Sequence, residues 1–584
     1  GSRGATSLLM QAVANLPQGA IILPGFDFDL PHDVWDSMQD DLVSEDHPQY
    51  RFRKLMNLLA LSRDDITSWD NAEPAHPARN ALVSLSLRPA PVTDQWLRDG
   101  PLLGDLVAAT EGLTLLEATS PRAEAEAIAL RLRIAAQDGK TAALISPDRI
   151  LTRQVTAALD RWDIKPDDSA GVPLSLSPPG RMLRHVADLF GKPVTGESLL
   201  TLLKHPLCHS DGEDRGPHLR FARELELELR RSGPPFPTHE TLSEWVRKTT
   251  KPEGDRVAWA AWIGQLITGL DDPAEQDLLQ HLEKHIALAE RLSGGPLNTD
   301  SGELWTQAAG REARRICDNL IENADAGGSL TTREYASLFG AVLSECVVRN
   351  PDGAHPNILI WGTLEARVQG ADLIILGGMN EGAWPEAAAP DPWLNRNLRK
   401  AAGLLLPERR IGLSAHDYQQ AVAGKEVWIS RAKRTADAET VPSRWVNRLV
   451  NLLDGLPAQN GVVALEKMRA QGETWLSMAA SLSVPEIAIE AAKRPSPMPP
   501  VEARPKSISV TQVKTLIRDP YAIYAHKVLR LKALDPLAPR VDAPLRGMIV
   551  HEVLEKFIKS GTQAVDPNAR EILMSLSNEI FERD

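Results

Sequence analysis

The sequence predicts an α/β protein in which a large helical insertion interrupts a parallel sheet. Three observations predict this class. Short apolar strands alternate with amphipathic helices at 113–162, helical sequence then fills 180–350, and apolar strands return at 358–376. Strands that alternate with helices of about 12–16 residues indicate parallel βαβ units.

The composition is that of an ordinary folded protein. Hydrophobic residues make up 43% and charged residues 24% of the 584 residues, which excludes a disordered or fibrous chain. The length indicates about three to five domains. No run of about 18 apolar residues and no secretory signal is present, so we expect a cytoplasmic protein without a membrane span. The opening Gly1-Ser2-Arg3-Gly4 and the helical sequence up to Asp584 are interpreted as a piece of a longer protein.

Charge and cysteine usage restrict the possible ligands. The net charge of −13 means that any contact with DNA is confined to local basic patches. Cys208, Cys317 and Cys346 are far apart and have no metal-ligand spacing, which argues against a disulfide framework and a zinc ribbon. We expect reduced thiols.

The first predicted elements are a helix at 6–16 and a buried parallel strand at Ala20–Leu23, because this apolar run ends in Pro24-Gly25. Helical sequence follows to about Ala72, and prolines then mark loops. A strand is predicted at Leu113–Ala118.

The βαβ pattern continues after this strand. Ser120-Pro121 predicts the start of a helix over Arg122–Gln137, since a hydroxyl can cap the first turn and proline fits there. A strand at Ala142–Ile145 and a helix at Ile150–Trp162 follow. Further strands are predicted at 358–361, 371–376 and 426–430, with a helix at 414–424 before the last of them. Helices are predicted over 441–482, and an extended proline-rich linker at 491–507.

Gly139-Lys140-Thr141 is compared with a phosphate-binding loop and rejected. That loop needs G-x-x-x-x-G-K-[ST] after a strand and before a helix, whereas this tripeptide follows a helix, enters a strand and has Ile134 at the first glycine position. We interpret Gly139 as a helix C-terminal glycine. The chain contains no Walker A motif.

The segment 358–385 is the most specific feature. A buried strand leads into Gly377-Gly378-Met379-Asn380-Glu381-Gly382, and such a loop can present amides and side chains to a phosphate or a nucleotide. The alternative is a strand-end turn without a ligand. Together with Gly362-Thr363-Leu364-Glu365, this layout resembles motif V of superfamily 1 helicases of the UvrD/RecB type. The resemblance implies a nucleotide or phosphate contact by Gly378 and Glu381.

A second match lies at 427–434. Val427-Trp428-Ile429-Ser430-Arg431-Ala432 resembles the strand and Thr-Arg-Ala of helicase motif VI. In that family the arginine reaches the γ-phosphate of ATP, which implies a nucleotide or phosphate contact for Arg431. Ser430 replaces the family's threonine, and Walker A is absent. A structural or DNA-facing Arg431 is therefore the alternative.

The last module resembles a RecB-type nuclease domain. Asp519-Pro520-Tyr521 resembles its entry, and Gly547, His551, Glu555 and Phe557 match its first motif, G-x-x-x-H-x-x-x-E-x-F. His551 and Glu555 share one helix face at i, i+4. The resemblance implies that both residues serve the nuclease site, with His551 as a ligand of Mg²⁺; the alternative is a structural histidine.

The order of these modules resembles the AddB family, the B subunits of AddAB helicase–nucleases, in their alphaproteobacterial form. Leu23-Pro24-Gly25-Phe26-Asp27 and His47-Pro48-Gln49-Tyr50 support this form. The implied fold is α/β, with parallel-sheet superfamily 1 helicase-like lobes, a large helical insertion and the start of a PD-(D/E)xK nuclease domain. The implied domains are the remainder of a first helicase-like lobe at 1–112, a second lobe at 113–190 and 350–450, the insertion at 191–349, a helical segment and linker at 451–506, and an incomplete nuclease domain at 507–584.

The resemblance implies a subunit of an ATP-dependent helicase–exonuclease that processes DNA double-strand breaks for recombinational repair with an AddA-type partner. It implies ATP for the complex and Mg²⁺ for the intact nuclease. Many family members hold an iron–sulfur cluster, but Asp519 replaces the first ligand cysteine, so we expect no cluster here. Two alternatives remain open: a catalytically inactive helicase-like scaffold that scans DNA for a Chi-like sequence and binds partners, and an unrelated α/β enzyme that binds a nucleotide or sugar at 377–385.

Overall fold

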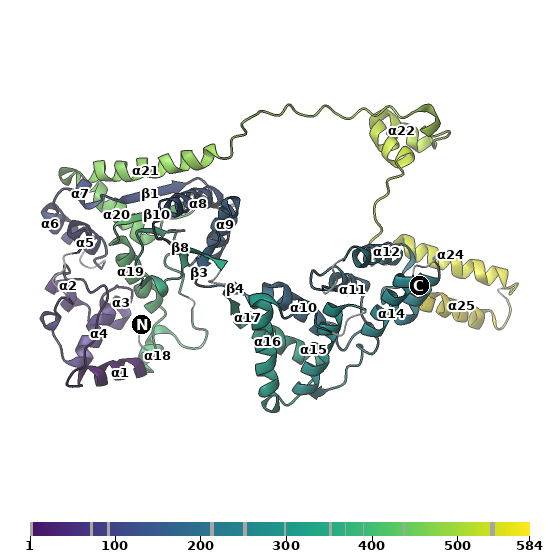
Figure 1. Cartoon of the computed structure of the whole chain (residues 1–584), viewed down its shortest axis with the longest axis horizontal. Helices are drawn as coiled ribbons and strands as arrows, with labels where there is room; N and C mark the ends of the chain where they lie inside the picture. Colours follow the sequence, from purple (N-terminus) through teal and green to yellow (C-terminus); the bar gives the residue numbers. More distant parts are fainter. Residues whose placement is uncertain are drawn as a thin grey trace. The chain divides into compact units, whose positions relative to one another are not determined.

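The computed structural model describes residues 4–69, 74–89, 94–210, 215–248, 254–296, 300–349, 353–367, 369–388, 390–435, 438–537, 543–563 and 565–583. Two compact units divide the chain (Figure 1). Gly1–Gly171 with Arg349–Ala488 form one, here called the α/β unit. Val172–Val348 with Ile489–Asp584 form the other, here called the helical unit.

A six-stranded sheet forms the centre of the α/β unit, and every pair of neighbouring strands is parallel. This arrangement confirms the predicted α/β class. In spatial order the strands are β1 (Leu113–Ala118), β10 (Glu426–Ala432), β9 (Leu373–Leu376), β2 (Ala142–Ile145), β8 (His355–Trp361) and β3 (Pro166–Asp168). β1 and β2 have the predicted bounds.

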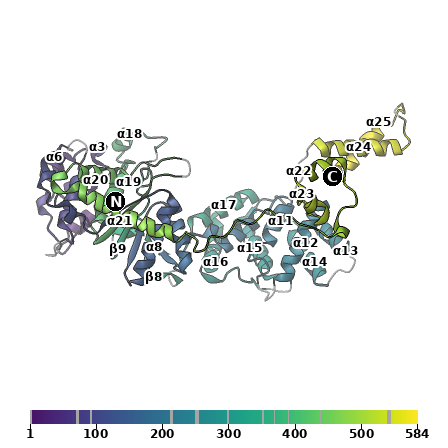
Figure 2. The same ribbon diagram turned by 90° about the horizontal axis from the view of Figure 1, so that it is seen from above.

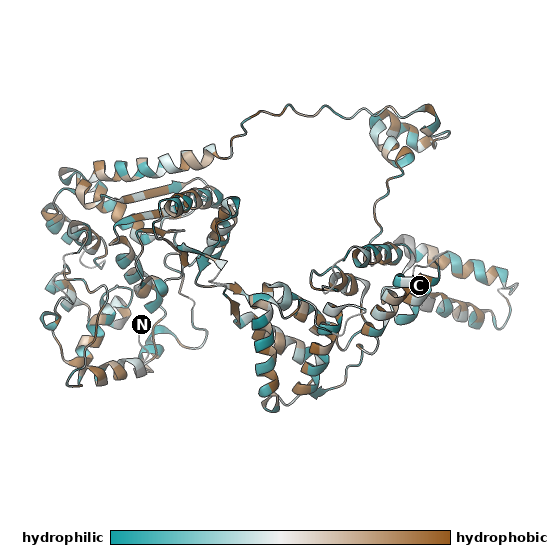
Figure 3. Cartoon of the chain, in the orientation of Figure 1, coloured by the Kyte–Doolittle hydropathy of each residue, from teal (hydrophilic) through white to brown (hydrophobic). Residues whose placement is uncertain are grey.

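Alternate residues of each strand enter two apolar cores, one on each face of the sheet. On β9, Leu373 and Ile375 pack with α8 (Pro121–Gln137) and α9 (Arg149–Leu159). Ile374 and Leu376 face the opposite core, to which α5 (Pro77–Ser86), α7 (Leu106–Ala109), α19 (Arg409–Val422), α20 (Arg444–Asp454) and α21 (Gly461–Ser481) contribute. Burial on both faces explains why most residues of β1, β2, β9 and β10 are apolar, and the sheet is largely brown in Figure 3.

Local capping defines the helices that follow β1 and β2. Ser120 Oγ accepts a hydrogen bond from the Ala123 amide at 3.2 Å, and Asp148 Oδ1 accepts from the Ile150 amide at 2.8 Å. These side chains satisfy amides that the first helical turn leaves unpaired. Gly139 has φ +69° in the turn between α8 and β2. This conformation agrees with the predicted C-terminal glycine.

The strand predicted at Ala20–Leu23 is wrong. These residues form neither helix nor strand, and the Ile22 side chain is 56% exposed. An apolar run becomes a buried parallel strand only where neighbouring strands and helices cover it. Instead, the following turn is held to α19, because Gln49 Nε2 donates to Gly25 O at 2.9 Å and to Gln419 Oε1 at 3.1 Å.

Two predicted boundaries differ from the structure. The helical unit begins at Val172 rather than 191, because β4 (Val172–Pro173) pairs with β7 (Val347–Val348). The helical segment predicted from 451 is not separate, since α21 packs along β1 and α8 within the α/β unit. Figure 2 shows α8, β9, α20 and α21 together in this unit.

Helices dominate the second unit, as predicted for 180–350. They are α10 (Pro178–Ala187), α11 (Gly196–Leu203), α12 (Gly216–Ser232), α13 (His239–Arg247), α14 (Gly254–Ile267), α15 (Leu278–Gly294), α16 (Gln307–Glu322) and α17 (Thr332–Glu345). Their core contains polar groups with defined partners. Neutral His285 accepts from the Tyr335 hydroxyl at 2.6 Å and donates to Leu183 O at 2.8 Å, and burial lowers its pKa to about 4.

The proline-rich stretch before the last module contains one short 3₁₀ turn, η10 (Val501–Ala503). Helices then follow: α22 (Val510–Arg518), α23 (Pro520–Ile523), a π-helical turn at Tyr524–Val528, α24 (Ala543–Lys559) and α25 (Ala569–Arg583). Among the described residues of the whole chain, no helix is both long and apolar enough to cross a membrane.

Candidate functional site

A polar cluster lies at the carboxyl ends of β1, β9 and β10. Parallel strands end at one edge of the sheet, and ligands of α/β proteins bind at this edge. The cluster brings together the predicted residues Gly378, Glu381 and Arg431, which come from the loop after β9 and from β10. His551 and Glu555 lie on α24, in the helical unit.

Arg431 is buried, with 6% of its side chain exposed, and each guanidinium nitrogen has a partner. Nη1 donates to Glu117 Oε1 at 2.9 Å, and Nε donates to Asn380 Oδ1 at 3.1 Å. Nη2 donates to the carbonyl and the hydroxyl oxygen of Thr440, both at 3.1 Å. Arg469 Nε also donates to Glu117, at 3.2 Å. Arg431 is therefore bound to acceptors of its own chain.

Glu124 lies beneath the same edge, 2% exposed, in the first turn of α8. Its Oε1 accepts the Gly378 amide at 2.9 Å and the Ser430 hydroxyl at 2.7 Å. Burial raises the pKa of this carboxyl to about 7, although the two hydrogen bonds oppose the shift. Glu124 thereby joins α8 to β9 and β10.

The loop after β9 uses its amides within the protein. The amides of Gly377, Met379 and Glu381 donate to Ile145 O at 3.0 Å, Ser430 O at 2.8 Å and Val441 O at 2.9 Å, and that of Gly378 donates to Glu124. A phosphate cradle needs several amides that converge on open space. The described loop instead ties β2, β9 and β10 together.

Glu381 is placed at the start of α20. Its carboxylate accepts the Arg444 amide at 3.2 Å and forms an ion pair with the Arg444 guanidinium. An anion at this position satisfies a free amide and interacts favourably with the helix dipole. This contact accounts for the acid in the loop without a ligand.

Arg431 and the loop amides of the cluster have partners within the protein. Its arginine and its glycine-rich loop are both bound internally, so the residues present do not fit the phosphates of ATP. The solvent-facing cations follow β10: Lys433 and Arg434 are exposed, and neither makes an ion pair within the described part of the chain. Exposed cations beside a sheet edge can neutralise DNA phosphates.

The predicted nuclease residues lie in a different setting. His551 and Glu555 are exposed on α24, and Glu555 pairs with Lys559 at 2.5 Å. Throughout the ranges that the structure describes, no three His, Cys, Asp or Glu side chains are grouped to hold a metal ion. The described residues therefore do not by themselves fit a Mg²⁺ site, and the role of His551 stays a prediction for the intact protein.

Asp519 stands where many members of the resembled family have the first cysteine ligand of an iron–sulfur cluster. Its carboxylate accepts the Ala522 amide at 3.2 Å and caps α23. Ser, Asp and Asn are the usual residues for such a cap. The absence of an iron–sulfur cluster stays a prediction, and the cap gives Asp519 a structural function.

Sequence analysis missed several residues of the cluster. Glu117, Asn380, Thr440 and Arg469 were not singled out, and Glu124 lies within the predicted helix Arg122–Gln137 without an assigned role. One signal was available for Glu117, since it is an acid inside an otherwise apolar buried strand. A charge in such a strand needs a partner, and Arg431 directly follows the strand predicted at 426–430.

Comparisons with known proteins give relatives without an assigned activity. No family model matches the chain. An uncharacterized protein of Rickettsia felis is 24% identical over 441 residues, which cover 74% of this chain and 46% of that protein. An uncharacterized protein of Rickettsia bellii is 24% identical over 281 residues, 48% of this chain and 32% of that protein. The chain thus spans less than half the length of these relatives.

Proposed function

We propose that this chain is a helicase-like scaffold of the AddB type, which binds DNA without hydrolysing ATP. In this proposal it belongs to a cytoplasmic helicase–exonuclease that processes double-strand breaks, and an AddA-type partner supplies the ATP-driven motor. The observation that carries the proposal is the burial of Arg431 against Glu117, Asn380 and Thr440. A γ-phosphate contact would require Arg431 to leave all three.

The absence of a Walker A motif from the sequence supports the same conclusion. Without that loop, the chain lacks the amides and the lysine that hold the β- and γ-phosphates in this class of ATPase. The parallel sheet and the motif-like loop then serve as a rigid frame. Lys433 and Arg434 are the groups on this frame that we assign to DNA phosphates.

Binding of a fluorescent single-stranded oligonucleotide, measured by anisotropy, tests the proposal. We expect Lys433→Gln/Arg434→Gln to weaken binding. The slope of log K against log[salt] should become less steep by about 1.4, because each phosphate contact on a single strand contributes about 0.7. A matched control is Lys425→Gln/Lys467→Gln. Lys425 and Lys467 line a pocket with Leu113, at the amino end of β1.

Three outcomes separate the possibilities. Binding by the wild type and the control, with a reduced slope in Lys433→Gln/Arg434→Gln, supports a DNA-binding scaffold. No binding by the wild type contradicts it. DNA-stimulated ATP hydrolysis by the purified chain would contradict the inactive scaffold and favour a subunit with its own motor activity.

A further inference from the structure

Residues 506–532, here called the basic segment, concentrate positive charge in an otherwise acidic chain. The whole chain has a net charge of −13, whereas this segment holds six cations and one acid. The acid is Asp519, whose carboxylate accepts the Ala522 amide as the cap of α23. The cations are Lys506, Lys514, Arg518, Lys527, Arg530 and Lys532.

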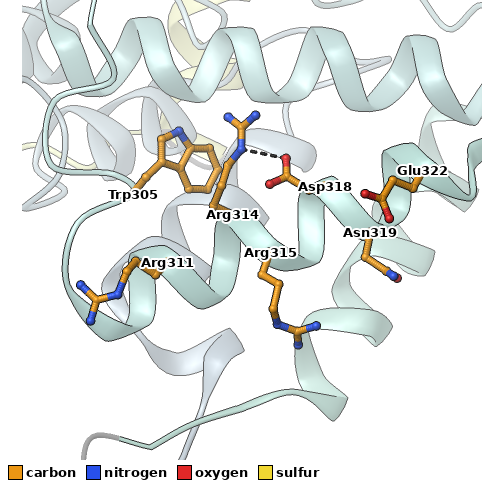
Figure 4. A pocket seen from close by; sticks show the side chains of 7 residues that line it. All are labelled: Trp305, Arg311, Arg314, Arg315, Asp318, Asn319 and Glu322. Atoms are coloured by element: carbon orange, nitrogen blue, oxygen red, sulfur yellow. Dashed lines mark hydrogen bonds and ion pairs between the residues drawn. The ribbon is translucent and has the colours of Figure 1, made fainter. Parts of the chain in front are cut away.

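The charge of these cations is free. All of them are exposed except Lys527, which is half-buried, and none forms an ion pair with a residue that the structure describes. The arginines in the hollow on α16 differ in this respect (Figure 4). There Arg314 Nε donates to Asp318 Oδ1 at 2.8 Å, and Arg315 donates two hydrogen bonds to Glu312. Unlike that hollow, the basic segment has cations available for an anionic ligand.

The fold of the segment places these cations on both sides of α23 along the chain. Lys514 and Arg518 are four residues apart and share one face of α22. Lys527 lies in the π-helical turn, and two more cations follow it. α22 packs against α23, and α23 packs against the turn. The cations therefore belong to one packed piece of structure, with Ile523 of α23 buried inside it.

Two tyrosines lie between the two groups of cations in the sequence. Tyr521 is 45% exposed, and its ring centroid lies 5.8 Å from that of Tyr524. Free cations beside an exposed aromatic ring suit a single-stranded nucleic acid, because the cations neutralise phosphates while the ring stacks on a base. A free phosphate ion would use only the charges.

We propose that the basic segment binds single-stranded DNA, with Lys514 and Arg518 on the phosphodiester backbone and the Tyr521 ring stacked on a base. This inference rests on the proposed function, which makes DNA the ligand. It adds a second set of phosphate contacts to Lys433 and Arg434, on different residues. The two sets can therefore be tested separately.

The other anionic surface to consider is a lipid membrane. Val510, Val513 and Ile517 of α22 are exposed, and a basic helix with an apolar side can lie on anionic lipids. The tyrosine pair favours DNA, since every base offers a π-face to an aromatic ring.

The first test compares Lys514→Gln/Arg518→Gln with the wild type in binding a fluorescent oligothymidylate, measured by anisotropy. Loss of two phosphate contacts should weaken binding and make the slope of log K against log[salt] less steep by about 1.4, so that the wild-type advantage shrinks about sevenfold from about 50 to 200 mM salt. Lys514→Arg/Arg518→Lys should keep the wild-type slope. The matched control is Arg247→Gln/Arg333→Gln, two exposed arginines on α13 and α17.

The second test asks whether the Tyr521 ring contacts a base. Tyr521→Ala should weaken binding of oligothymidylate about tenfold, in line with a base–aromatic stack, and should leave binding of an abasic oligonucleotide of equal length unchanged. Tyr521→Phe should keep the preference for oligothymidylate. Thermal unfolding shows that each variant is folded. Equal weakening with both oligonucleotides would overturn the stacking assignment.

The outcomes separate this inference from the proposed function. Wild-type binding with an unchanged slope in Lys514→Gln/Arg518→Gln overturns the inference and leaves the proposed function standing. No binding by the wild type overturns both. Sedimentation with vesicles of equimolar phosphatidylcholine and phosphatidylserine tests the lipid alternative. Vesicle binding that this variant weakens, together with unchanged oligonucleotide binding, would overturn the DNA assignment.

Discussion

Arg431 and Glu117 are register partners on the adjacent parallel strands β10 and β1, and Arg431 Nη1 donates to Glu117 Oε1 at 2.9 Å. Their side chains are 6% and 18% exposed. A buried ion pair gains little over an apolar pair, but removal of one partner leaves an uncompensated charge in the interior. The arginine that resembles a helicase phosphate contact is thus part of the frame of the sheet.

Glu117→Gln should lower the free energy of unfolding by about 3 kcal/mol, because it leaves the buried Arg431 guanidinium without its anionic partner. Arg431→Gln should cost less, since Arg469 still pairs with Glu117. The double variant should lose less stability than the two single variants together, by roughly 1–2 kcal/mol. Urea unfolding of the four proteins measures this coupling.

The matched control for this cycle is the surface pair Arg122–Glu126 on α8, whose side chains are 83% and 31% exposed and whose Nε and Oε1 atoms lie 2.8 Å apart. Arg122→Gln and Glu126→Gln should each change the unfolding free energy by less than about 0.5 kcal/mol. Additive losses at Glu117 and Arg431 would contradict the role assigned to their contact.

Glu124→Gln should alter how stability depends on pH. The folded-state pKa of Glu124 is raised to about 7, while the ordinary value is 4.5. Between these pH values the unfolded chain releases a proton that the folded protein keeps, so the carboxyl makes stability fall as pH rises. Glu124→Gln has no such carboxyl group. Its free energy of unfolding should therefore rise relative to that of the wild type by about 3 kcal/mol between pH 4.5 and 7.

Unfolding free energies at several pH values between 4 and 8 measure this difference, with Glu473→Gln on the exposed side of α21 as the control. The control should follow the wild-type profile. A difference between Glu124→Gln and the wild type that stays constant across this range would show that Glu124 does not keep its proton in the folded protein.

His551→Ala should lower Mg²⁺-dependent DNA cleavage by the intact protein with its partner, by roughly 10–100-fold, if the helix belongs to the nuclease site. Because His551 is exposed, the melting temperature should hardly change. His526→Ala, at another exposed histidine of the same module, should keep normal cleavage. Unchanged cleavage in His551→Ala would reject the metal role.

The sequence predicts the sheet well where apolar runs are short and bounded. β1 and β2 were predicted to the residue, because Thr119-Ser120-Pro121 and Ser146-Pro147-Asp148 end both strands with helix-starting signals. The same reasoning failed at Ala20–Leu23. That run has the right composition, but strand pairing depends on distant segments, and no segment among the residues that the structure describes pairs with it.

The candidate site was predictable only in part. Gly378, Glu381 and Arg431 were singled out and lie in one cluster, but their partners come from distant positions. Glu124 precedes Gly378 by 254 residues, and Glu117 precedes Arg431 by 314. Spacing along one sequence does not reveal such contacts, so it could not decide whether Arg431 is free for phosphate or bound within the fold.

Phosphate release from ATP by the purified wild-type chain, with and without saturating single-stranded DNA, tests the central claim most directly. The same preparation must bind a fluorescent oligonucleotide, which shows that it is folded and active in DNA binding. We predict DNA binding together with phosphate release equal to that of a protein-free control. DNA-stimulated release that Arg431→Lys abolishes would contradict the account, because Arg431 would then act on ATP.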